Sequence, residues 1–328
     1  MPRYARNAAI LAKIETTYGV DAAPTGAANA LLVSDLTITP LNANNVDRTL
    51  IRPYFGGAEQ LVGSASVDCE FSVELVGSGT AGTIEAWDAL LQGCGFLTGA
   101  LLTTPSRVEH TLVTDYGTFK GLTIYYHDDG ALHKLLGCRG TVSFDLNVGS
   151  RPTMKFKFTG LDGGLTAIAN PAVTLTAWKT PSVVTDPNTG ALVLGGTYAT
   201  GAITGGTEYI SGGLELDLGN QVKFTDLLGT AAASGQSVDL TGRETTGKVM
   251  FDLTAANEAT FFTNVKTNVA QSVGLVHGTT AGFNILVFAP KVQLVNPRKE
   301  DKDGRRLIGY DLRFLPDAGN DELKIVSL

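Results

Sequence analysis

Residues 67–75 of the chain read Val-Asp-Cys-Glu-Phe-Ser-Val-Glu-Leu, a strict alternation of apolar and polar side chains. A period of two residues is typical of an antiparallel β-strand with one buried face and one solvated face. The same alternation recurs in residues 142–147, 154–159 and 214–218. The sequence therefore predicts a mainly β protein.

Two segments predict short helices. The first places Ile84, Trp87, Leu90 and Leu91 on one apolar stripe, after a possible cap at Thr83 and with Glu85 in the first turn. The second carries Phe261, Phe262 and Val265 after Thr254. Two short helices in a chain rich in strands favour β-sandwich or barrel domains, each flanked by one short α-helix.

An internal repeat divides the chain. Residues 36–42 align with 214–220, and residues 67–75 align with 245–253, at a common offset of 178 positions. Paired strands at 141–146 and 153–159 are matched by 291–295 and 307–315, whose hairpin has an Asp-Lys-Asp-Gly turn at 301–304. Chance recurrence of the same element order is the alternative to duplication.

The repeat predicts two tandem domains. The first is residues 1–165, with an N-terminal arm at 1–30 and a long loop at 42–64; the second is residues 206–328. Residues 166–205, rich in Gly and Thr, are predicted to connect them.

The loop at 42–64 is longer than a turn requires, and its composition favours contact with a partner over ordinary loop packing. Residues 219–242 are its counterpart, with a tip of Ala, Ser and Gly at 229–236. The candidate contact residues are Arg48, Arg52, Tyr54 and Phe55 in the first loop and Lys223 and Phe224 in the second.

Composition excludes several classes of protein. The 328 residues include 32 acidic and 25 basic side chains, and a net charge of −7 argues against a surface that grips nucleic acid. No apolar stretch is long enough to span a membrane, and the N-terminus does not read as a signal peptide. Three cysteines without a CxxC spacing indicate buried free thiols, which agrees with an intracellular protein.

Two motifs that could indicate a cofactor or metal site are better explained as a connection and a turn. The G-x-G-x-x-G run at 77–82 lies among alternating strands without a suitably placed acidic residue, so a flexible connection is favoured over a dinucleotide site. His127, Asp128, Asp129 and His133 could be metal ligands, but Asp-Asp-Gly at 128–130 also predicts a hairpin turn. No catalytic residue, cofactor or metal is assigned, and the chain is not predicted to be an enzyme.

Residues 13–24, Lys-Ile-Glu-Thr-Thr-Tyr-Gly-Val-Asp-Ala-Ala-Pro, run into the strand-like segment 31–40. This stretch, with the order of elements after it, resembles major tail tube proteins of long-tailed, non-contractile (siphovirus-type) bacteriophages. The resemblance covers the first 160 or so residues best. It implies a β-sandwich with a flanking helix, whose copies join sheets into a closed ring, and rings stacked by a long loop and an N-terminal arm.

The same resemblance implies a structural virion protein of the tail, assembled in the host cytoplasm, that forms the hollow tube through which genomic DNA is ejected. Rings of that family are usually hexamers of single-domain subunits, whereas two domains per chain predict a trimer of about 103 kDa with pseudo-sixfold symmetry. Double-stranded DNA would pass a lumen lined by acidic and small polar residues, with Lys and Arg paired at interfaces. Tape measure, tail tip and terminator proteins are the other implied partners, and no membrane is.

Two alternatives from other classes stay open. A carbohydrate-binding or capsid-decorating β-sandwich would predict monomers or non-stacking oligomers and an exposed aromatic platform, which Trp87 and Trp178 do not form in the sequence. An enzyme would need a polar pocket with perturbed carboxylates, for which no constellation is evident.

Overall fold

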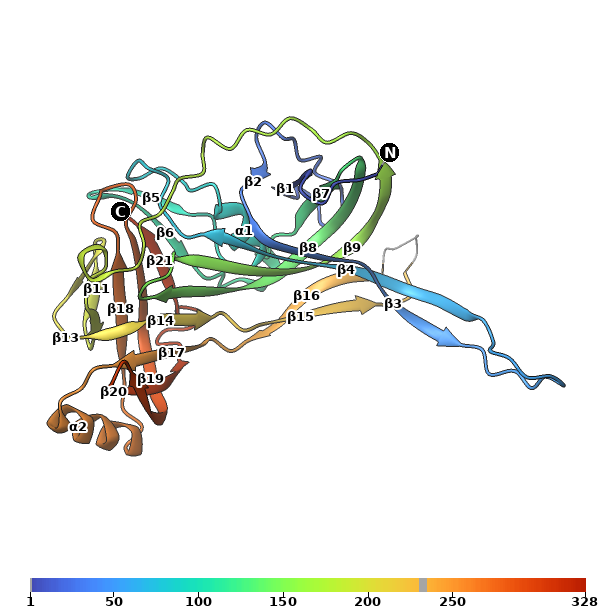
Figure 1. Cartoon of the computed structure of the whole chain (residues 1–328). Coiled ribbons are helices and arrows are strands. Elements are labelled where there is room, and N and C mark those ends of the chain that lie inside the picture. The colour runs from blue at the N-terminus through green and yellow to red at the C-terminus, as the bar shows by residue number, and fades with distance from the viewer. Residues whose placement is uncertain (1, 230–234) are drawn as a thin grey trace.

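Strands make up most of the computed structural model, which describes residues 2–229 and 235–328 (Figure 1). The predicted mainly β fold is confirmed. Residues 230–234, within the expected tip at 229–236, lie outside the described residues.

The first half contains nine strands and one α-helix. They are β1 (Ala8–Ile14), β2 (Ala30–Leu31), β3 (Ser34–Asp47), β4 (Gln60–Glu74), α1 (Asp88–Gly93), β5 (Ala100–Thr103), β6 (Ser106–Thr111), β7 (Leu122–Asp128), β8 (Ala131–Asn147) and β9 (Thr153–Ala167).

The remaining elements belong to the connection and the second half. They are β10 (Leu192–Leu194), β11 (Thr197–Ala199), β12 (Ala202–Thr204), β13 (Thr207–Tyr209), β14 (Ser211–Asp217), β15 (Asn220–Asp226), β16 (Gln236–Arg243), β17 (Thr246–Phe251), α2 (Ala255–Lys266), β18 (Ala270–His277), β19 (Ile285–Lys302), β20 (Arg305–Phe314) and β21 (Lys324–Ser327). The connection expected at 166–205 thus contains short strands of its own.

An antiparallel run of eight strands organises the molecule. Its order is β3-β4-β9-β8-β14-β17-β20-β19, and β8 of the first half pairs with β14 of the second. A second link joins β6 to β21. Sheet hydrogen bonding therefore continues across both halves, and their division into two domains stays a prediction.

The two halves use the same strand order and the same register. Ile38 of β3 faces Cys69 of β4, and Leu216 of β14 faces Gly247 of β17, each 178 positions later. β4 then pairs with β9 as β17 pairs with β20. The offset seen in the sequence is thus also the offset of the hydrogen-bonded ladders.

The core lies on one face of this run. Phe71, Phe156 and Phe158 stack there with ring centroids 5.8–5.9 Å apart, and Trp87 is buried with them. The three cysteines are free and buried, as predicted. Each fully buried large apolar side chain contributes roughly 1.5–3 kcal/mol, so the alternating residues supply the main stabilisation.

The helix predictions are half right. α2 begins after Thr254, whose hydroxyl accepts a hydrogen bond from the backbone N–H of Asn257 at 3.3 Å. α1 begins at Asp88, so Thr83 is not its cap and Glu85 is not in its first turn. Instead, the buried carboxylate of Glu85 bonds to His110 and Ser327, and residues 86 and 87 form a turn before the helix.

The long loop expected at 42–64 is about half strand. Residues 42–47 belong to β3 and residues 60–64 to β4, which leaves 48–59 as the tip of a hairpin. Its second-half counterpart is the β15–β16 hairpin. In Figure 1 both hairpins project from the same side of the molecule, and β3–β4 reaches farther.

Candidate assembly surfaces

The tip of the β3–β4 hairpin exposes large apolar side chains. Phe55 is 107% exposed and Tyr54 is 65% exposed relative to the free residue. Leu50 and Ile51 beside them are also exposed. A protein that stays monomeric rarely displays such a cluster, because apolar surface in contact with water is unfavourable.

The two arginines predicted at this tip have partners inside the hairpin. Arg48 forms an ion pair with Glu59, and Nη1 of Arg52 lies 3.4 Å from the carbonyl oxygen of Gly57. Both contacts link opposite arms of the tip. The structure therefore brings together Arg48, Arg52, Tyr54 and Phe55 on one tip.

Ile51, which was not among the predicted contact residues, is 105% exposed. An apolar pair, Leu50 and Ile51, directly before Arg52-Pro53 was the available signal, because neither residue fits a strand alternation.

The β15–β16 hairpin carries the second pair of predicted contacts. Lys223 is exposed on β15, whereas Phe224 is half-buried opposite Val238. Beyond them, Leu227 and Leu228 are exposed, Leu228 fully, and the sequence analysis did not name them. The two hairpins thus resemble each other in having apolar residues toward the end.

The N-terminal run holds parts of both halves together. Glu15 is buried, and its carboxylate accepts hydrogen bonds from the backbone N–H groups of Gly19 and Gly137 at 2.7 Å and from Thr123 Oγ1 at 2.9 Å. Tyr18 reaches the second half, where its hydroxyl oxygen accepts from the N–H of Val238 at 2.6 Å. These residues therefore anchor the arm.

A polar face covers the eight-stranded run opposite the core. Glu70 lies between Lys157 at 3.1 Å and Lys155 at 3.4 Å, and the hydrogen bond from Lys157 lowers the pKa of this carboxyl. On β20, the hydrogen bond from Asn296 and the ion pair with Arg298 lower the pKa of Asp311. Charges of both signs alternate across this face.

A family model described as "Phage tail tube protein" matches residues 5–314. The chain belongs to this family. No curated protein sequence is significantly similar to it. Membership of the tail tube family identifies the chain as a structural component of a phage tail. The match covers most of the second half as well as the N-terminal stretch that suggested the resemblance.

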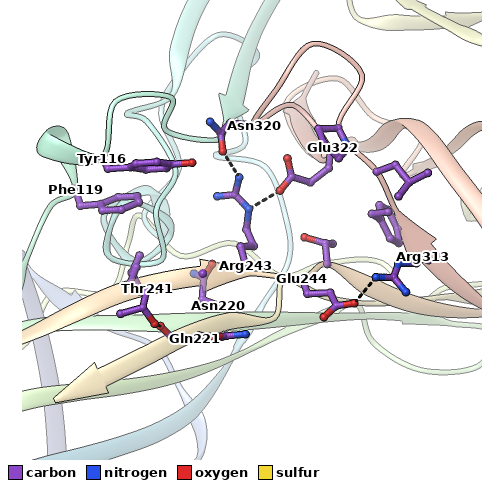
Figure 2. Close-up of a pocket in the computed structure, with 16 residues that line it drawn as sticks. Tyr116, Phe119, Asn220, Gln221, Thr241, Arg243, Glu244, Arg313, Asn320 and Glu322 are labelled. Atoms are coloured by element: carbon purple, nitrogen blue, oxygen red, sulfur yellow. Dashed lines mark hydrogen bonds and ion pairs between the residues drawn. The ribbon is translucent and has the colours of Figure 1, made fainter.

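A cleft of this tail tube protein lies at the root of the β15–β16 hairpin and has a volume of about 800 Å³ (Figure 2). Arg243 bonds there to Glu322 at 2.5 Å and to Asn320 at 3.0 Å, and Arg313 pairs with Glu244 at 2.9 Å. Each of these arginines is thus paired with a carboxylate. The Arg243 pair connects β16 to the loop before β21, and the Arg313 pair connects β20 to the residue two positions before β17.

The Gly-rich run at 77–82 takes part in packing between the halves, and residues 128–130 take part in a turn. Gly77 lies so close to the second half that a Cβ there would meet the carbonyl oxygen of Gly282 at 2.3 Å, and the N–H of Gly79 donates to that oxygen at 2.8 Å. Asp129 and Gly130 form the predicted β7–β8 turn with positive φ. In the described parts of the chain no cluster of His, Cys, Asp or Glu could hold a metal ion.

Within residues 2–229 and 235–328, no helix has the length and apolar character needed to cross a membrane.

Proposed function

We propose that this protein polymerises as stacked rings into the hollow tail tube of a siphovirus-type phage, through which genomic DNA is ejected. The observation that carries the proposal is the exposed apolar tip of the projecting β3–β4 hairpin in a member of the tail tube family. Burial of Ile51, Tyr54 and Phe55 against the next ring would remove this surface from water.

Three chains would complete one ring, because each chain supplies two copies of the same strand order. In this ring the polar sheet face lines the lumen. Lys155 and Lys157 on this face are paired with Glu70, so they offer less attraction to DNA phosphates than free cations would. Tape measure, tail tip and terminator proteins are proposed to meet the ends of the tube.

Substitution of Arg52→Ala together with Tyr54→Ala tests the stacking surface. We expect a folded protein whose tubes, viewed by negative-stain electron microscopy, require at least a tenfold higher concentration. Both side chains lie outside the core, so the thermal unfolding transition should stay within about 2 °C of that of the parent protein.

The matched control is Tyr116→Ala with Lys120→Ala, because Tyr116 has nearly the same exposed fraction as Tyr54, 66% against 65%. The control should form tubes normally. Normal tubes from the Arg52 and Tyr54 variant would refute the assignment of the tip. Dispersed monomers of the parent protein at every concentration would instead favour a β-sandwich binding or capsid-decorating module.

A further inference from the structure

Within the eight-stranded run, the two halves of the chain meet where β8 pairs with β14. Ser143–Asn147 at the end of β8 pairs antiparallel with Gly213–Asp217 of β14. The preceding part of the same β8 edge is occupied by β7, which pairs with residues up to Cys138. One edge of β8 is therefore shared by a strand of its own half and a strand of the other half.

The second half repeats this arrangement but leaves it incomplete. β19 is the equivalent of β8, and β18 occupies the first part of its edge, from Ile285 to Gln293. From residue 294 to 302, β19 pairs only with β20, on its opposite edge, as far as the described residues show. Unpaired N–H and C=O groups on such an edge readily accept another strand.

The strand that would fit this edge is β3, which has one open edge in the described structure. β3 is the equivalent of β14, and in the described structure it pairs with β4 alone. The equivalence extends to backbone detail, because Asp35 has φ +55° and Gly213, 178 positions later, has φ +117° beside the same bulge.

The apolar side chains of β3 are less buried than the equivalent side chains of β14. Leu214 and Leu216 lie on β14, which has β8 as its neighbour in the sheet, and they are 1% and 2% exposed. Their equivalents on β3, Leu36 and Ile38, are only half-buried. The difference is what a missing neighbouring strand would produce.

We propose that the open edge of β19 in one chain pairs antiparallel with the open edge of β3 in a second copy of the same chain. This deepens the proposed function, on which it rests, by naming the surface that closes the ring. The ladders common to both halves fix the register: Glu300 corresponds to Asp145 and Thr37 to Glu215, which face each other inside the chain. Thr37 of one chain therefore faces Glu300 of the next.

Charge agrees with this register. The proposed register places Lys302 opposite Asp35. It also places Arg298 opposite Thr39, whose neighbour on β4 is Asp68. Cross-strand pairs of opposite charge favour the pairing by roughly 0.2–1 kcal/mol each.

Disulfide trapping tests the register. Cα atoms of directly opposed residues in an antiparallel pair lie about 4.5–5.5 Å apart, within the range that a disulfide spans. We expect Thr37→Cys with Glu300→Cys, assembled and then mildly oxidised, to give covalent dimers and trimers on non-reducing electrophoresis. The native cysteines are buried and should not react.

Two control variants complete the experiment. Asp145→Cys with Glu215→Cys places the same pair at the internal junction and should give an intrachain disulfide, with no covalent oligomer. Thr37→Cys with Lys302→Cys shifts the register by two residues and should give at least fivefold less covalent oligomer. Circular dichroism of each reduced variant checks that it folds.

The outcomes separate this proposal from the proposed function. If the parent protein forms tubes but the Thr37 and Glu300 pair cross-links no better than the shifted pair, the junction is wrong and the tube function stands. If the pair cross-links efficiently but no tube forms under any condition, the junction stands and the tube function fails.

Discussion

At the residue scale, a cluster of buried charges is the least expected feature. His110 is fully buried between Glu85, 2.8 Å from its Nε2, and Asp88, 3.2 Å from its Nδ1. Ser327 of the C-terminal strand also bonds to Glu85. Burial alone would lower the pKa of His110, but Asp88 and Glu85 outweigh it and raise that pKa. Through its bond to Glu85, Ser327 ties the second half to this cluster of the first half.

The raised pKa makes a contribution to stability that depends on pH. A group with a folded-state pKa above its unfolded value stabilises fully below the unfolded pKa, about 6.5 for histidine, and loses this contribution as the pH rises through the folded value. We expect His110→Gln to lower the free energy of unfolding by about 3 kcal/mol at pH 6, since it leaves buried carboxylates unpaired. The loss should be smaller at pH 9. Urea unfolding of both proteins at the two pH values measures it, and an equal loss at both would contradict a charged imidazole.

At the scale of elements, the success of sequence-based prediction follows burial. Strands such as β4 and β8, with one face in the core, have a clear alternation in the sequence. Residues 42–47 of β3 have no buried face and include three asparagines, so neither alternation nor strand propensity indicated a strand. Their pairing with β4 outside the core is what makes them a strand.

The same logic explains the helices. The Thr254 cap of α2 is a local interaction and could be predicted from the sequence. The late start of α1 depends on Glu85 meeting His110 and Ser327, which are 25 and 242 positions away, and no local pattern records that contact.

The cap of α2 gives a prediction at this scale. Thr254→Ala removes the acceptor for the N–H of Asn257 and should lower the free energy of unfolding by about 1 kcal/mol. Thr263→Ala in the exposed middle of the same helix is the control, and it should be neutral or slightly stabilising because alanine favours helix. Thermal or urea unfolding compares them; equal effects of the two substitutions would argue against the cap.

At the scale of the whole molecule, the repeat could be recognised from short matched segments, and the structure adds a shared register. The two open edges could not be predicted, because the sequence does not say which strands remain unpaired after folding. Likewise, the exposed tip residues were partly named, but their clustering depends on the extra length of β3 and β4.

The proposed closure predicts the mass of a single ring. Three chains give about 103 kDa, and native mass spectrometry of the Arg52→Ala, Tyr54→Ala variant should show this trimer, because that variant keeps the sheet edges and loses the stacking tip. A hexamer of whole chains would show that the two halves are not equivalent in the ring.

The internal β8–β14 junction has a consequence for assembly kinetics. Its two strands belong to one chain. The effective concentration of one strand near the other is therefore on the order of millimolar and does not depend on the concentration of protein. In a ring of three chains, half of the junctions would then form during folding, and dilution could break only the other half. In the proposed ring, two equivalent halves within one chain would reduce the molecularity of ring formation from six bodies to three.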